Sequence, residues 1–205
     1  MSEERDADGR APSKVTELLR PQLLVVVVGI LGVGVFFGTM LTALTSFMED
    51  RGAPEQAGLL YGVMGVGSAI LALGVAWLPP RFSLRSRWLV FSGILLLGSL
   101  LLLFVDTPAA MAWALGIMGI GIGPTLVTQY SFGAARSPLG RSATVMTMLG
   151  SAVIVGQSLG AAVTGGIAES WGTSAALLLP MIAAAIAVGA GVVNWFLSRT
   201  HPRTR

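Results

Sequence analysis

Six apolar stretches, separated by short polar segments, follow one another along the chain. Each has roughly the 17–25 residues that a transmembrane helix needs. Because lipid cannot hydrogen-bond an open backbone, only helices or a closed barrel cross a bilayer. The pattern predicts an all-α membrane protein with a six-helix domain over 22–197, a leader over 1–21 and a tail over 198–205. The helices are predicted at 23–48, 57–78, 88–105, 109–131, 143–168 and 174–197.

The charged residues divide between the two ends of these helices. Of the thirteen Lys and Arg, all but Arg51 lie in the termini or in the loops after the second and fourth stretches. The loops on the other side carry Glu49, Asp50, Glu55, Asp106 and Glu169. Since short cytoplasmic loops are rich in Lys and Arg, both termini are predicted to be cytoplasmic in a multi-pass protein of the plasma (inner) membrane. Tryptophans near the helix ends are predicted to be interfacial anchors: Trp77, Trp88, Trp171 and Trp195.

Composition excludes several classes of function. The chain is 54% hydrophobic and 11% charged, against about 25% charged in a soluble domain. Its net charge of +3 lies in short loops between apolar stretches, so we expect no nucleic-acid partner. It has no cysteine, a single histidine in the tail (His201), and no GxxxxGK[ST] phosphate loop. We therefore expect no metal, no cofactor and no enzymatic activity.

Polar side chains recur at helical spacing on the first, second, fourth and fifth stretches. Helices that line a polar cavity need such a stripe, whereas lipid-facing helices do not. The third and sixth stretches lack one and are predicted to be outer scaffold. The candidate cavity residues are Thr39, Thr42, Tyr61, Thr125, Thr128, Gln129, Ser151 and Gln157.

The stripes have an alternative explanation. Ser and Thr in membrane helices often bond to carbonyls of their own helix or to a neighbouring helix. Gln129, Gln157 and Tyr61 are better cavity candidates, because a larger polar group buried without a partner costs several kcal/mol.

Glycines are frequent on the fourth and fifth stretches. Gly156 and Gly160 have the small-xxx-small spacing that lets helices approach closely. Gly119, Gly123 and Pro124 free part of the backbone, and they predict a kink that serves as a hinge or is simply accommodated by packing.

No Asp, Glu or His lies within the six stretches. Proton-coupled pumps generally use such a residue as a relay. Three alternatives follow: coupling residues lie on another chain, transport is uncoupled, or Glu49 or Asp50 acts at the outer mouth.

Two segments carry a resemblance to a known family. They are residues 37–70, FGTMLTALTSFMEDRGAPEQAGLLYGVMGVGSAI, and residues 116–172, GIMGIGIGPTLVTQYSFGAARSPLGRSATVMTMLGSAVIVGQSLGAAVTGGIAESWG. Together with six helices and both ends inside, they resemble the C-terminal six-helix half of a major facilitator superfamily transporter, with the character of bacterial drug or sugar efflux members. The similarity spans nearly the whole chain after residue 15. The resemblance implies a 3+3 inverted repeat.

The chain also departs from that family. Members have twelve helices in two halves, and the loop WLPPRFSLRSR keeps only the basic character of the family's glycine and Asp-Arg signature. Two copies, inserted the same way up, would rebuild twelve helices around a two-fold axis. The sequence therefore leaves three hypotheses. The chain is a half-size transporter of a neutral or amphiphilic solute, working as a homodimer or with a separately encoded N-terminal half. Alternatively, it is a membrane scaffold or accessory subunit, or an inactive truncated half.

Overall fold

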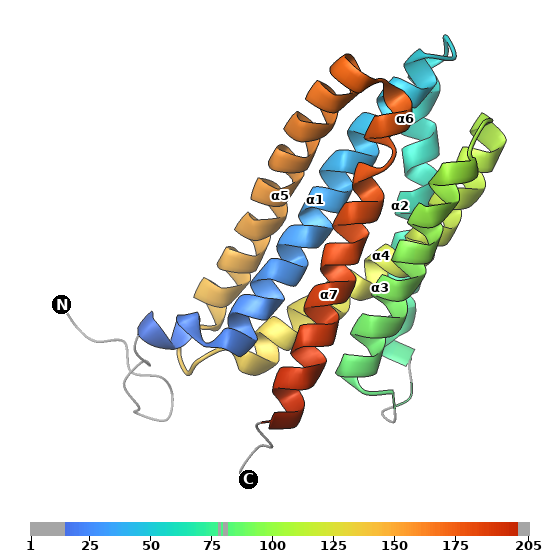
Figure 1. Ribbon diagram of the computed structural model, residues 1–205. Helices are drawn as coiled ribbons and strands as arrows, with labels where there is room; N and C mark the ends of the chain where they lie inside the picture. The colour runs from blue at the N-terminus through green and yellow to red at the C-terminus, as the bar shows by residue number, and fades with distance from the viewer. Residues whose placement is uncertain (1–14, 78, 80–81, 201–205) are drawn as a thin grey trace.

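Six membrane-length helices make up the computed structural model, which describes residues 15–77, 79 and 82–200 (Figure 1). They are α1 (Pro21–Glu49), α2 (Ala57–Gly74), α3 (Leu84–Leu100), α4 (Pro108–Arg136), α5 (Ser142–Trp171) and α7 (Leu179–Thr200). Shorter helical turns are η1 (Val15–Leu19), η2 (Pro54–Gln56), η3 (Val75–Trp77), η4 (Leu101–Phe104) and α6 (Thr173–Ala176). These residues contain no strand, and the predicted all-α fold is confirmed. Most of the predicted leader, residues 1–14, and His201 lie outside the described residues.

Hydroxyl caps fix the start of two helices. Ser83 Oγ accepts a hydrogen bond from the Ser86 amide at 3.3 Å, and Thr107 Oγ1 accepts one from the Ala110 amide at 3.2 Å. Such caps satisfy amide groups that the first helical turn leaves without partners. The Ser83 cap starts α3 at Leu84 rather than at residue 88, so the basic residues after it belong to the helix and not to a loop.

The sixth apolar stretch is divided rather than continuous. Gly172, with φ of +83°, ends α5, and the short helix α6 follows at once. Pro180 lies in the first turn of α7, where a missing amide hydrogen costs little. The segment predicted as one helix over 174–197 is therefore α6, a turn and α7. The fourth helix is also longer than predicted, because α4 continues to Arg136 and not only to residue 131.

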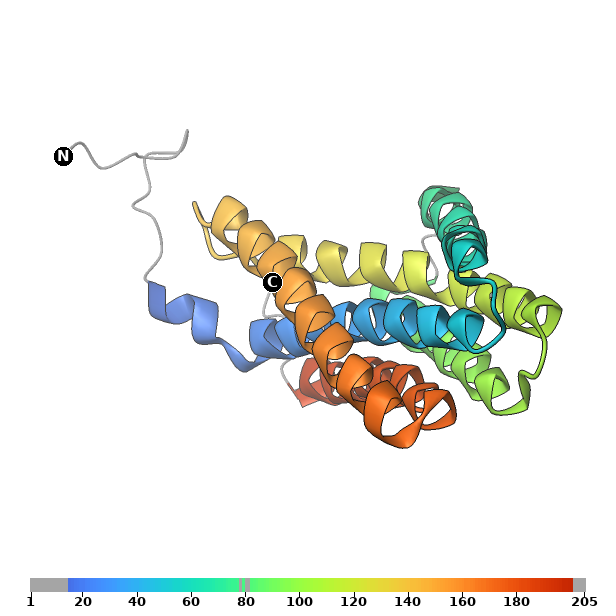
Figure 2. The ribbon, with the colours of Figure 1, turned by 90° about the horizontal axis from the view of Figure 1, so that it is seen from above.

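The chain consists of two three-helix halves, α1 to α3 and α4 to α7, whose first helices occupy equivalent positions. α1 packs chiefly on α5 and α7, while α4 packs chiefly on α2 and α3. Each of these two helices thus contacts the second and third helices of the other half. Because two spans, α2 and α3, lie between α1 and α4, these two helices run in opposite directions across the membrane. This is the predicted 3+3 inverted repeat, and Figure 2 shows α1 between α4 on one side and α7 on the other.

Glycines on α1 and on α4 make equivalent close contacts with a neighbouring helix. A Cβ at Gly34 or Gly38 of α1 would clash with backbone carbonyls of α5. A Cβ at Gly119 or Gly123 of α4 would clash in the same way with backbone carbonyls of α2. Glycines four residues apart therefore let each central helix touch the backbone of its partner, as in close-packed membrane helices.

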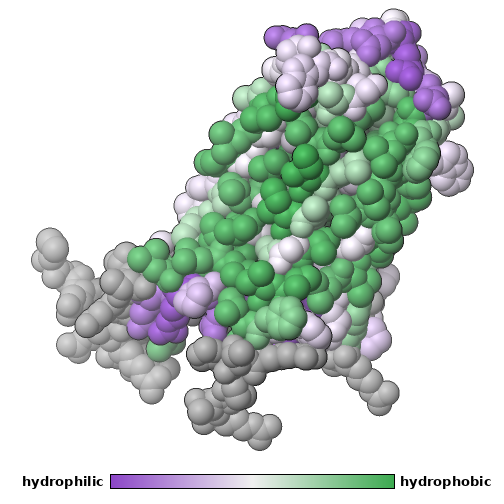
Figure 3. Space-filling model, viewed as in Figure 1, coloured by the Kyte–Doolittle hydropathy of each residue, from purple (hydrophilic) through white to green (hydrophobic). Residues whose placement is uncertain are grey.

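On the face that Figure 3 shows, the surface is apolar along the helices and carries polar residues towards both ends. Trp77 and Trp171 are largely exposed near helix ends, as interfacial anchors are. Trp88 is fully buried instead, and its Nε1 donates a hydrogen bond to the Ala187 carbonyl at 3.1 Å. The prediction that Trp88 anchors the interface was wrong, because α3 turns this side chain toward α7.

Arg51 joins two loops at the acidic end of the molecule. Its guanidinium donates hydrogen bonds to the Phe47 carbonyl at 3.1 Å and to the Asp106 carbonyl at 2.8 Å. It also lies 3.5 Å from the centre of the Phe47 ring. This exception to the charge pattern is therefore a clasp between the loop after α1 and the loop before α4.

Candidate functional site

The polar stripe of α4 faces the interior of the chain. Thr125, Thr128 and Gln129 are all fully buried. Thr125 Oγ1 donates to the Gly121 carbonyl and Thr128 Oγ1 to the Pro124 carbonyl, each at 2.7 Å. These two hydroxyls are thus satisfied by their own helix, which is the alternative that the sequence left open.

Gln129 differs from its two neighbours on the stripe. Neither its Nε2 nor its Oε1 has a hydrogen-bond partner within the part of the chain that the structure describes. A Cβ built on Gly29 would lie 3.0 Å from Nε2, which places the amide against α1. The Trp88 ring closes the same space, since its edge also lies against Gly29. A buried amide without partners is costly, so Gln129 marks a place where a water molecule or a polar solute group would be stabilised.

The candidates on α1 and α2 differ in burial. Thr39 is buried, and its hydroxyl donates to the Phe36 carbonyl at 3.0 Å. It lines an apolar groove of about 210 Å³ between α1, α5 and α7. Thr42 and Tyr61 are half-buried, and Tyr61 packs against the main apolar core. These three residues therefore do not share one pocket with Gln129.

The α5 stripe lies on the outside of the chain. Ser151 and Gln157 are exposed, as are Thr144, Thr147 and Ser158. Ser158 Oγ donates to the Ile154 carbonyl at 3.0 Å. The opposite face of the same helix is buried against α1. One side of α5 is thus fitted to this chain, and the other presents hydroxyl and amide groups outward.

The glycines singled out in the sequence lie at helix contacts. A Cβ at Gly156 or Gly160 of α5 would come within 2.5 Å of a backbone oxygen of α1, and one at Gly119 within 2.6 Å of the Met64 carbonyl on α2. Gly123 faces the Ser68 carbonyl in the same way. Pro124 is buried within α4, which continues through it as one helix. All five therefore lie at or beside packed surfaces, and whether Pro124 acts as a hinge stays a prediction.

Tyr130 is a candidate that the sequence stripes did not select. It is half-buried, and its hydroxyl lies 3.9 Å from the position of a Cβ on Gly150. It therefore sits at the seam between α4 and α5, beside the outward-facing stripe of α5. The sequence feature that could have identified Tyr130 is its position directly after Gln129 on the same helix.

In residues 15–77, 79 and 82–200, no three His, Cys, Asp or Glu side chains gather closely enough to hold a metal ion. The site consists of hydroxyls, amides and close helix contacts.

This fold and this distribution of polar faces define a class: a multi-pass helical membrane protein built as an inverted repeat. The family model of the Major Facilitator Superfamily matches residues 2–153. The chain therefore belongs to this superfamily of membrane transporters. No curated protein and no solved structure matches the chain in the corresponding searches.

Proposed function

We propose that this chain forms one wall of a solute path, completed by a second six-helix bundle, and that it exports a neutral or amphiphilic small molecule. The second bundle is another copy of the chain or a separately encoded homologous half. The observation that carries the proposal is the outward-facing polar stripe of α5.

Covering the polar stripe of α5 with lipid would cost free energy. Gln157 is exposed near the middle of α5, and Ser151 lies nearly two turns before it on the exposed surface. An amide facing hydrocarbon without a partner costs several kcal/mol. A water-filled path, or contact with another bundle, removes that cost.

α2 offers a second incomplete surface. Of its residues only Ala57 and Met64 are buried. A Cβ added at Gly58, Gly62 or Gly65 would meet nothing within 4 Å. Small residues exposed at this spacing allow another helix to approach closely. Since α2 and α5 are equivalent helices of the inverted repeat, we propose that α2 of one bundle packs on α5 of the other.

The chemistry of the exposed faces favours an uncharged or amphiphilic solute. The outward groups on α5 are hydroxyls and an amide, and half-buried Tyr130 lies beside them. Among the described residues, the carboxylates of the membrane-length helices are Glu49 at the end of α1 and Glu169 near the end of α5, so none lies midway along a helix to balance a cation. A coupling carboxylate, if transport is proton-driven, belongs to the second bundle or to the acidic loops.

The charge distribution supports an orientation with both termini in the cytoplasm of a plasma-membrane protein. Arg20, Arg85 and Arg136 lie together at one end of the bundle, while Glu49, Asp50 and Glu169 lie at the other. Excess Arg marks the cytoplasmic side of short loops.

The first test is the oligomeric mass in nanodiscs, combined with site-directed crosslinking. Because the chain has no cysteine, single substitutions give clean reporters. We expect a dimer in which Gly65→Cys on one copy crosslinks to Ser158→Cys on the other, because both residues are exposed and lie near the middle of their helices. Gly93→Cys on α3 is the matched control, because its surroundings are equally open but it lies on the scaffold side.

Transport is then measured with the same protein in liposomes, using a panel of uncharged and amphiphilic fluorescent solutes. Solute movement that requires the dimer supports the proposal. A dimer that moves none of the solutes, and whose α5 stripe only packs against its partner, favours the scaffold hypothesis. A monomer without crosslinks refutes the homodimer, and only a separately encoded half then remains as a transporter.

A further inference from the structure

A pocket of basic and apolar residues opens at the end of the bundle where α1 begins and α4 ends. Its volume is about 590 Å³. Three of its lining residues are arginines that come from different elements: Arg20 precedes α1, Arg85 is in the first turn of α3, and Arg136 ends α4. Residues far apart in the sequence thus bring three positive charges to one cavity.

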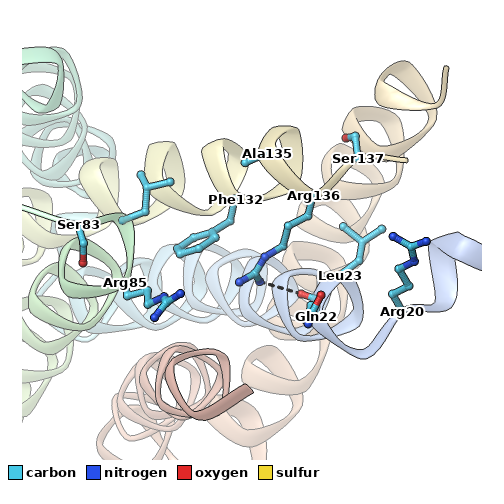
Figure 4. Close-up of a pocket in the computed structure, with 10 residues that line it drawn as sticks. Arg20, Gln22, Leu23, Ser83, Arg85, Phe132, Ala135, Arg136 and Ser137 are labelled. Carbon is cyan, nitrogen blue, oxygen red and sulfur yellow. Dashed lines mark hydrogen bonds between the residues drawn. The ribbon is translucent and has the colours of Figure 1, made fainter. Parts of the chain in front are cut away.

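The arginines are held in different ways. Arg136 Nη1 donates to the Gln22 carbonyl at 3.1 Å and to Asn194 Oδ1 at 2.6 Å. Its guanidinium lies 4.6 Å from the centre of the Phe132 ring. Figure 4 shows Arg85 and Arg136 directed toward one another from opposite sides of the space beside Phe132. Arg136 is therefore fixed by α1 and α7, whereas Arg85 is exposed.

The described residues give the pocket charge of one sign. None of its ten lining residues carries a carboxylate. Glu17 pairs with Arg20 at 2.8 Å but does not line the cavity. Like charges directed into one space repel each other, and an anion between them relieves that repulsion. Guanidinium groups bind phosphate oxygens especially well, because their N–H groups form a planar fork.

We propose that this pocket binds the phosphate of an anionic phospholipid headgroup. Two observations favour a lipid over a free anion. The cavity lies at the ends of membrane helices, at the level where headgroups lie. It is also amphipathic, because Leu23, Leu84 and Phe132 line it beside the arginines. Basic pockets between membrane helices on the cytoplasmic side bind lipid headgroups in this way.

Membrane orientation alone does not account for this arrangement. The rule that Arg is enriched on the cytoplasmic side requires only that these residues lie at that end of the bundle. Other arginines at the same end have different roles. Arg87 donates to the Phe82 carbonyl at 2.8 Å and thereby fastens the loop before α3. Arg141 precedes α5 and does not line the pocket. The convergence of Arg20, Arg85 and Arg136 on a shared cavity is a separate feature.

The test is native mass spectrometry of the full chain released from nanodiscs that contain equal amounts of phosphatidylglycerol and phosphatidylcholine. We expect the protein to retain phosphatidylglycerol selectively. Arg85→Gln and Arg20→Gln are each expected to lower that retention about fivefold, the change expected when one basic charge near an anionic membrane is removed. Arg141→Gln is the matched control, with the same charge change at the same end, and is expected to retain the lipid. Arg136 is left intact because it also joins α4 to α1 and α7.

Two results would overturn the proposal. If Arg141→Gln lowers retention as much as Arg85→Gln does, the attraction is a general property of the basic end and not of the pocket. If millimolar inorganic phosphate raises the melting temperature of the delipidated protein as much as phosphatidylglycerol does, the pocket binds free phosphate and the lipid assignment is wrong. Neither readout depends on transport, so the proposal stands or falls apart from the proposed function.

Discussion

A close contact between α1 and α5 gives the sharpest test of the packing argument. In Gly156→Ala, the new Cβ would lie 2.5 Å from the Leu31 carbonyl oxygen and 2.9 Å from the Val35 amide nitrogen. Ordinary van der Waals contact begins at 3.4 Å. Both neighbours are backbone atoms of α1, so no side chain can rotate away. α1 and α5 must separate, although they form the most extensive helix pair in the chain.

Such overpacking costs about 1–3 kcal/mol. For a chain of this size each kcal/mol lowers the melting temperature by about 2–4 °C. Gly165→Ala in the same helix is the matched control, because its Cβ would meet nothing within 4 Å. There the better helix propensity of alanine is expected to raise stability by up to about 1 kcal/mol.

The assay is thermal unfolding followed by tryptophan fluorescence in identical nanodiscs. We expect the melting temperature to fall for Gly156→Ala and to stay level or rise for Gly165→Ala. Equal stability of Gly156→Ala and the parent chain would refute the close-packing role. Gly156→Leu should disrupt the assembly of the bundle more than it affects solute binding.

Three further predictions concern polar groups. Gln129→Leu removes a buried amide without partners, so we expect folding stability to rise by about 1–3 kcal/mol while solute uptake falls; loss of folded protein would instead reveal a structural hydrogen bond. Gln157→Leu should reduce solute binding, measured by fluorescence titration, without changing expression, and unchanged binding would exclude this amide from the path. Arg51→Gln removes the clasp to the Asp106 carbonyl and should cost about 0.5–1.5 kcal/mol, with faster proteolysis in the loop before α4. Unchanged proteolysis there would contradict the clasp.

Equal sequence signals led to unequal positions in the structure. Gln129 and Gln157 each lie in a polar stripe on a membrane helix, yet Gln129 is fully buried and Gln157 is exposed. Helical periodicity fixes which residues share a face, but not how the helix is rotated against its neighbours. That rotation is set by packing, here by the glycine contacts of α1 with α5 and of α4 with α2.

The sequence by itself determined the six spans, the charge difference between the two ends and the glycine spacings that allow close approach. Those features depend on local composition and on the thickness of a bilayer. Only the tertiary structure decided that Trp88 is buried against α7 and that Arg20, Arg85 and Arg136 meet in one pocket. Both depend on contacts between residues distant in the sequence, which arise only when the helices have packed in their final order.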